Sequence, residues 1–177
     1  MSHTRKVVLV MVDTQRTDML GCYGNAGMKT PSLDRLAAEG IRFDRAYTCQ
    51  PVCGPARAGM FTGTFPHSNG VWANSMALGD NVKTIGQRLR DSGIHTAYVG
   101  KWHLDGPYRG GFTPPGPRRQ GFDYWAASDC CHNYMRSWYY RDTPEPIWID
   151  GYDADHFTGL TIDYMRSHCD MPFCLFL

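Results

Sequence analysis

Apolar residues along the chain cluster into short runs that predict buried strands. Residues 6–12 form a continuous run, rich in valine, that ends at Asp13. Such a run predicts a buried parallel strand that presents an acid at its carboxyl edge, where open α/β sheets bind their ligands. Residues 94–99 form a similar run and predict a second central strand, which delivers the sequence Gly-Lys-Trp-His at residues 100–103 to the sheet edge.

Other segments repeat apolar residues at helical spacing. Thr30 and Pro31 give an N-cap and a first-turn signal for a short helix that Gly40 ends. Residues 81–90 predict a second helix, and Asp155 is expected to cap a third. Predicted helices and strands therefore alternate along the chain.

Three further segments complete the pattern. Residues 41–47 predict a strand, whereas residues 106–122 are crowded with Gly, Pro and Arg and predict a long surface loop. Pro172 opens a last strand over residues 173–177, and the sequence stops inside it. Because an apolar strand needs neighbours that cover it, we expect residues 1–177 to be the N-terminal part of a larger, truncated domain.

Composition narrows the classes of function. The chain has 177 residues, 42% of them hydrophobic, which is enough to bury a core. Its 18 basic and 17 acidic residues give a formal net charge of +1, so no strong field favours nucleic acid or a membrane as a partner. The first apolar run is too short to span a bilayer, no signal peptide is visible, and seven cysteines, an odd number, suit reduced thiols. The expected compartment is the cytoplasm.

The most specific pattern in the chain is C-x-P-x-R-x-x-x-x-T-G, which runs from Cys53 to Gly63. Pro55 suits the first turn of a helix, so Cys53 is expected at a helix N-terminus, where free amides and the helix dipole favour an anion. Arg57, one turn further on, can reach back to hold the nucleophile or the anion. The alternative is a structural cysteine that precedes an ordinary helix.

This motif resembles the signature of the sulfatase family, which belongs to the alkaline phosphatase superfamily. The resemblance implies an α/β fold with a mostly parallel central sheet flanked by helices, incomplete in residues 1–177, which would be the N-terminal part of a sulfatase catalytic domain. It also implies that a formylglycine-generating enzyme oxidises Cys53 to formylglycine during maturation. Further positions that look similar to the family are Asp13, Gly21, Cys22, Tyr23, Gly24, Asn25, Thr30, Pro31, Leu33, Asp34, Leu36, Pro66, His67, Gly70, Val71, Gly100, Lys101, Trp102 and His103.

The resemblance implies roles for individual residues. Asp13 and the modified Cys53 would bind a divalent metal, most often Ca²⁺, with Mg²⁺ or Mn²⁺ as other possibilities. Lys101 and His103 would contact sulfate oxygens or the bridging oxygen of the leaving group, and their spacing would place both side chains on one face of an extended segment. Asn74, in a polar turn downstream of the nucleophile, is expected to contact the substrate.

One position departs from the family pattern, and one cluster of cysteines and histidine lacks the spacing of a metal site. Most family members follow the first acid with a second carboxylate, but here Thr14 stands in that place, which lowers the ligand charge and would weaken calcium binding. Cys130, Cys131 and His132 look like metal ligands, yet they lack the C-x-x-C spacing of a structural zinc site. We therefore interpret these three as packing and loop residues.

The implied activity is hydrolysis of a sulfate ester. A hydroxyl of the hydrated aldehyde at position 53 would attack sulfur, Arg57 and Lys101 would stabilise the developing charge, and a histidine would protonate the leaving alcohol. The substrate would be a sulfated sugar, a sulfated glycan or an aryl sulfate. One alternative is a phosphonate or phosphodiester hydrolase that uses the same modified residue, and another is an inactive truncated product.

Overall fold

The computed structural model describes residues 5–177. The described residues divide into two compact units, which we call the sheet unit (residues 5–11 and 49–177) and the small unit (residues 12–48). Each unit is described by itself. Within residues 5–177, no helix combines the length and the apolar content that crossing a bilayer requires.

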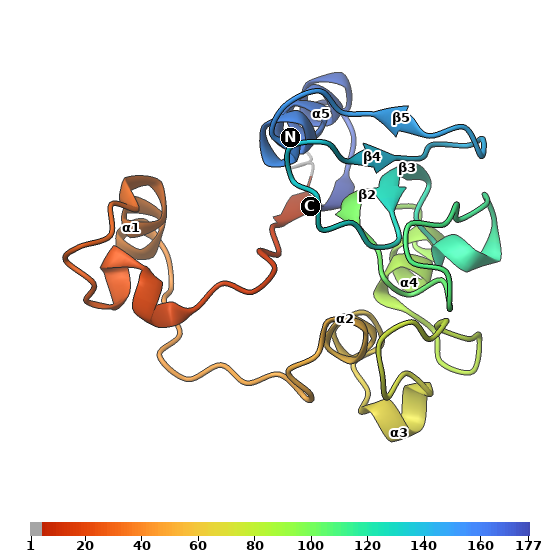
Figure 1. The fold of residues 1–177 in the computed structure, drawn as a ribbon, viewed down its shortest axis with the longest axis horizontal. Coiled ribbons are helices and arrows are strands. Elements are labelled where there is room, and N and C mark those ends of the chain that lie inside the picture. The colour runs from red at the N-terminus through yellow and green to blue at the C-terminus, as the bar shows by residue number, and fades with distance from the viewer. Residues whose placement is uncertain (1–4) are drawn as a thin grey trace. The chain divides into compact units, whose positions relative to one another are not determined.

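A four-stranded, fully parallel sheet forms the centre of the sheet unit (Figure 1). Its strand order is β1-β6-β2-β3, so β6 and β2 are the inner strands. This arrangement confirms the predicted parallel sheet. The strand bounds are β1, Lys6–Leu9; β2, His95–Lys101; β3, Tyr124–Ser128; and β6, Phe173–Phe176.

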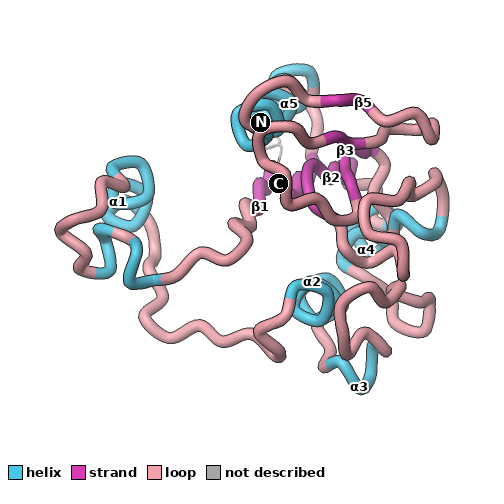
Figure 2. Tube along the Cα trace, viewed as in Figure 1, coloured by secondary structure: helices cyan, strands magenta, loops and turns pink. Residues whose placement is uncertain are grey.

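Helices cover both faces of this sheet (Figure 2). On one face, Tyr98 and Phe176 of the sheet pack with Phe61 of α2 (Cys53–Thr62), next to α4 (Ile85–Asp91). On the other face, Ala97 and Leu175 pack with Tyr164 of α5 (Asp153–Ser167). Neighbouring residues on a strand point to opposite faces, so the two helical layers bury both sides of the inner strands, over residues 96–100 of β2 and 173–176 of β6.

Aromatic rings fill the core beneath α2. The ring of Trp102 lies with its centroid 5.4 Å from Phe61, 5.0 Å from Tyr98 and 5.3 Å from Trp125. Because Trp102 is fully buried, it fixes the chain directly after β2 against the core. Smaller elements complete the unit: α3 (Pro66–Asn69), the 3₁₀ turn η3 (Pro117–Arg119), and the antiparallel pair β4 (Trp138–Tyr139) and β5 (Ile147–Trp148).

Two predicted helices begin at other residues than expected. The helix predicted over residues 81–90 begins at Ile85, because Thr84 and Gln87 form a capping box that fixes the first turn there. Asp155 does not cap α5, since that helix begins at Asp153 and Tyr152 is its N-cap residue. The loop predicted over residues 106–122 is present, with only the short turn η3 inside it.

The small unit contains α1 (Pro31–Glu39) and two 3₁₀ turns, η1 (Thr17–Met19) and η2 (Gly21–Tyr23). Helix α1 ends at Gly40 as predicted, but the Thr30 hydroxyl does not cap it. That hydroxyl accepts a hydrogen bond from the Gly21 amide and donates one to Asp34 Oδ1. The strand predicted over residues 41–47 is wrong: the segment has no strand partner, and Ile41 is 82% exposed.

Strand β1 is shorter and more exposed than predicted. It ends at Leu9, before Asp13, and Val7 remains 54% exposed. Among the described residues β1 pairs only with β6, so it is an edge strand rather than an inner one. Asp13 therefore lies in an exposed turn and not at the end of a buried strand.

Thr84 gives a test of how α4 is attached to the loop that follows β2. Its buried hydroxyl donates to the Gln120 carbonyl at 2.7 Å and accepts from the Gln87 amide at 3.2 Å. We expect Thr84→Val to lower the free energy of unfolding by about 1–3 kcal/mol, because it leaves both groups unsatisfied. Urea unfolding measures this loss. Ser92→Ala, which removes an exposed hydroxyl at the other end of α4, is the control, and an equal loss in both variants would contradict the expectation.

Candidate active site

Cys53 is the first residue of α2, as the motif predicted. Val52 before it is extended, and the Gly54 amide at the open helix end donates to Asn74 Oδ1 at 2.8 Å. A Cβ atom at position 54 would lie 3.3 Å from both that oxygen and the Ala73 carbonyl, so a glycine suits this close approach. Gly63 closes the helix in the left-handed conformation that glycine favours, at φ 69°.

Arg57 joins α2 to the end of β2. Arg57 is 4% exposed, and its Nη1 donates to the Lys101 carbonyl at 2.6 Å and to the Tyr98 hydroxyl at 3.0 Å. The Tyr98 hydroxyl also donates to the Lys101 carbonyl. A buried guanidinium needs such acceptors, and here they belong to the strand that carries Lys101.

The segment after β2 changes direction at His103. Lys101 is half-buried and is the last residue of the strand, Trp102 enters the core, and His103 is 2% exposed with φ 57°. A left-handed residue interrupts the extended backbone. The expectation that Lys101 and His103 share one face of an extended segment therefore does not hold.

Cys130 shows which charged groups surround this region. Burial raises the pKa of its thiol, the charges of Lys101 and Arg109 lower it, and those of Asp129 and Cys53 raise it. The start of α2 and the end of β2 thus lie within electrostatic range of the same buried sulfur. Its Sγ lies 3.3 Å from His132 Nε2.

The neighbours of Cys130 form local contacts. Cys131 Sγ accepts a hydrogen bond from the Asn133 amide at 3.5 Å. Within residues 5–177, no group of three or more His, Cys, Asp or Glu side chains is arranged as a metal site.

The sequence interpretation missed Asp129, which directly follows β3. Its side chain is 2% exposed, and Oδ1 accepts a hydrogen bond from the Asp105 amide at 3.1 Å. Burial raises the pKa of this carboxyl to about 6, although the backbone amides of Asp105, Leu104 and His103 act in the opposite direction. An acid directly after a buried strand was the available signal, and it is the same signal that drew attention to Asp13.

A divalent cation would find only part of its ligand shell in the described residues. Asp13 offers a hard carboxylate, and Thr14 beside it, at φ 61°, offers only a neutral hydroxyl. Calcium takes about six to eight oxygen ligands. The donors present fit one part of such a shell and not a complete one.

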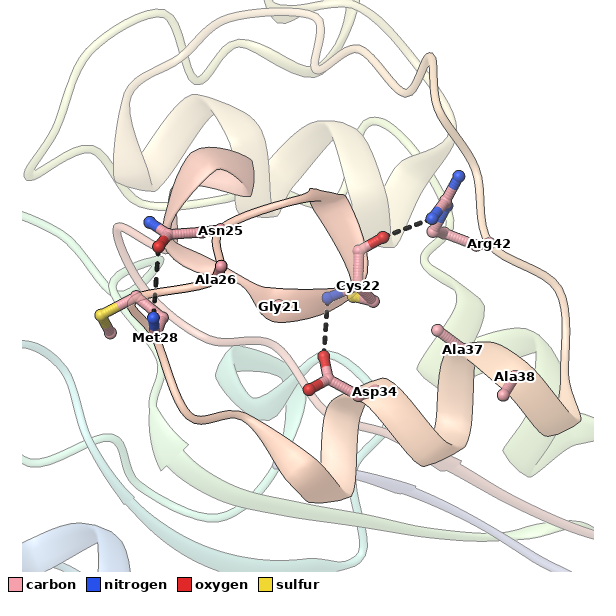
Figure 3. Close-up of a pocket in the computed structure, with 9 residues that line it drawn as sticks. All are labelled: Gly21, Cys22, Asn25, Ala26, Met28, Asp34, Ala37, Ala38 and Arg42. Atoms are coloured by element: carbon pink, nitrogen blue, oxygen red, sulfur yellow. Dashed lines mark hydrogen bonds between the residues drawn. The ribbon is translucent and has the colours of Figure 1, made fainter.

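A separate hollow of about 520 Å³ lies within the small unit (Figure 3). The Asp34 carboxylate there accepts a hydrogen bond from the Cys22 amide at 2.6 Å, and the Arg42 guanidinium donates one to the Cys22 carbonyl. The Asp34 bond holds turn η2 against α1, and the Arg42 bond joins the same turn to the segment that follows α1. None of the residues predicted to be catalytic lines the hollow, which is formed by Gly21, Cys22, Asn25, Ala26, Met28, Asp34, Ala37, Ala38 and Arg42.

Comparison with known protein families gives one match over nearly the whole chain. The family model described as Sulfatase matches residues 5–177. This chain belongs to the sulfatase family.

Individual relatives agree with this assignment. The chain is 52% identical over 119 residues to the protein named uncharacterized sulfatase YidJ of Escherichia coli (strain K12), an alignment that covers 67% of the chain and 24% of the relative. It is 42% identical over 170 residues to an ulvan-active sulfatase of Formosa agariphila, with 94% of the chain and 33% of the relative covered. This sulfatase chain thus spans about a third or less of the length of these curated relatives.

Solved structures share the fold. The yidJ protein of Bacteroides fragilis has a TM-score of 0.91 and 30% identity, over 98% of the chain and 43% of its own length. An enzyme in complex with its substrate D-glucosamine-2-N,6-O-disulfate has a TM-score of 0.84 and 32% identity, over 98% and 33%. The phosphonate monoester hydrolase of Agrobacterium radiobacter has a TM-score of 0.53 and 29% identity, over 67% and 24%.

The raised pKa of Asp129 predicts a pH dependence of stability. The folded state keeps the Asp129 proton up to about pH 6, whereas the unfolded chain releases it near the ordinary aspartate pKa. The contribution of Asp129 to the free energy of unfolding therefore falls as the pH rises between about 4 and 6 and is level above that window. An NMR titration of the Asp129 carboxyl carbon measures the midpoint directly, and a midpoint near 4 would contradict this expectation.

Proposed function

We propose that this sulfatase hydrolyses the sulfate ester of a sulfated sugar, through a formylglycine made from Cys53 and with a divalent cation. The observation that carries the proposal is the complete motif from Cys53 to Gly63, folded so that Cys53 is the first residue of α2. A helix N-terminus favours a bound anion such as sulfate. The sugar is favoured because relatives include an ulvan-active sulfatase and an enzyme solved with a disulfated glucosamine.

The modified residue at position 53 would be made by a formylglycine-generating enzyme, which is the proposed maturation partner. Its hydrated aldehyde supplies one hydroxyl to attack sulfur and a second that lets the aldehyde re-form as sulfate leaves. An unmodified thiol would keep the sulfate in a covalent product without that route. Asn74 holds the Gly54 amide and would thereby fix the backbone next to the nucleophile.

Cationic groups at the end of β2 would bind the sulfate oxygens. We assign this role to the Lys101 ammonium, whose backbone Arg57 holds through the Lys101 carbonyl. His103 would protonate the bridging oxygen of the leaving alcohol. When bound, the cation, for which calcium is the first candidate and Mg²⁺ or Mn²⁺ the others, adds positive charge at the sulfate, and Asp13 would give it an oxygen ligand.

A phosphonate or phosphodiester substrate is the second candidate function. The similarity to the phosphonate monoester hydrolase, over 67% of the chain, favours it. The Gly-Lys-Trp-His sequence at residues 100–103 favours sulfate, because it resembles the sulfatase pattern on the leaving-group side. Turnover of an aryl sulfate compared with that of the matching aryl phosphonate, by the same preparation, separates the two. Faster turnover of the phosphonate would exclude the sulfatase proposal.

Formation of formylglycine is expected at Cys53 and at no other cysteine. Only Cys53 has proline and arginine at the required offsets, whereas Cys49 has Pro51 but carries Cys53 where the arginine would be. Mass spectrometry of peptides, after co-expression with a formylglycine-generating enzyme, measures the loss of the thiol. Cys49 is the internal control. An intact thiol at position 53 under these conditions would refute the proposed nucleophile.

Lys101→Ala is expected to lower turnover far more than stability. A cation that meets charge developing in the transition state contributes on the order of a hundredfold or more to the rate. Steady-state kinetics on an aryl sulfate and a thermal unfolding curve measure the two effects. Lys29→Ala, which removes an exposed lysine of the small unit, is the matched control. Equal turnover in the two variants would exclude this role for Lys101.

A further inference from the structure

Consecutive backbone amides directly after β2 interact with one buried carboxylate, that of Asp129. The Asp105 amide donates to Asp129 Oδ1 at 3.1 Å, and the amides of Leu104 and His103 also stabilise the charged form of Asp129. Successive amides around a left-handed residue form a concavity that binds an anion. In this protein the anion is a side chain of the neighbouring strand.

Asp129 reaches this concavity because β2 and β3 are parallel neighbours in register. Lys101 pairs with Ser128, and the Trp102 amide then donates to the Ser128 carbonyl at 2.8 Å. Asp129 follows at once, so its side chain meets the segment that turns at His103. The register of the sheet thus sets the position of the carboxylate relative to residues 103–105.

His103 needs such support, because a left-handed backbone conformation is uncommon and strained for a residue other than glycine. The rest of the segment is also held. The Leu104 carbonyl accepts from the Leu78 amide at 2.9 Å, and the Asp105 carboxylate accepts from Arg118 Nε at 2.6 Å. Asp129 is the group that acts on the amides of residues 103–105 themselves.

Burying a carboxylate costs desolvation free energy, so stability alone does not explain why one holds this loop. Asp129 Oδ2 is buried and has no hydrogen-bond partner among the described residues. The raised pKa of Asp129 has desolvation as its largest cause, which shows that burial disfavours the charge. Such local costs are typical of functional sites.

We propose that Asp129 is a positioning residue, whose carboxylate holds the backbone of residues 103–105 so that His103 and Lys101 keep the orientation that catalysis requires. This inference rests on the proposed sulfate-ester hydrolysis. Asp129 acts through the backbone and does not itself touch the substrate.

The test compares Asp129→Ala with Asp129→Asn in the formylglycine-containing enzyme, using a series of aryl sulfates. We expect Asp129→Ala to lower kcat on the order of tenfold to a hundredfold with little change in KM, because misplaced catalytic groups cost this much. Asn keeps an oxygen that can accept the Asp105 amide, so Asp129→Asn should restore most of kcat. Asp123→Ala, at the other end of β3, is the matched control; its carboxylate accepts from Thr96 at 3.1 Å.

The leaving group distinguishes positioning of His103 from a general loss of structure. If Asp129 holds the group that protonates the leaving oxygen, the loss in Asp129→Ala should be larger for phenols of high pKa than for phenols of low pKa. A loss that is equal across the series, or an Asp129→Asn variant as slow as Asp129→Ala, would overturn the inference.

Amide hydrogen exchange at residues 103–105 tests the same inference without activity. We expect faster exchange in Asp129→Ala than in Asp123→Ala, and equal exchange would overturn the positioning role. If the unmutated enzyme hydrolyses no sulfate ester, the proposed function fails. The exchange measurement then still decides whether Asp129 holds the segment.

Discussion

The buried guanidinium of Arg57 is the constraint on which the rest of the site depends. It belongs to the helix that begins at Cys53, yet it donates to the Lys101 carbonyl at the end of β2. A charge that is removed from water must be satisfied by good acceptors, so helix and strand cannot shift independently. This single bond therefore sets the start of α2 against the end of the strand that carries Lys101.

Packing of the aromatic core also fixes α2 against the end of β2. Trp102 is fully buried between Lys101, which ends the strand, and His103, which begins the turn. Its packing against Phe61 of α2 joins the same two elements that Arg57 joins. Interiors are packed too closely to adjust continuously, so polar residues on either side of a core residue are held in fixed positions. Three residues after Trp102, the backbone amide of Asp105 donates a hydrogen bond to the carboxylate of Asp129.

Membership of the sulfatase family is consistent with the presence, in one chain, of the motif from Cys53 to Gly63 and of the Gly-Lys-Trp-His sequence at the end of β2. The alignment that covers most of the chain spans only a third of the curated relative's length. The part that the chain covers includes the motif from Cys53 to Gly63 and the segment of Lys101 and His103 at the end of β2.

The sequence by itself determined features that a local pattern encodes: the apolar runs of the inner strands β2 and β6, and the helix that starts at Cys53. The spacing of apolar residues and of proline is sufficient for these. It failed for residues 41–47, which have strand composition but no strand partner, and for β1, whose burial depends on what lies beside it. Only the tertiary structure decided that Arg57 binds the Lys101 carbonyl, that His103 is left-handed and that Asp129 faces its backbone. These contacts join residues far apart in the chain, and strand register and packing, which no local pattern encodes, bring them together.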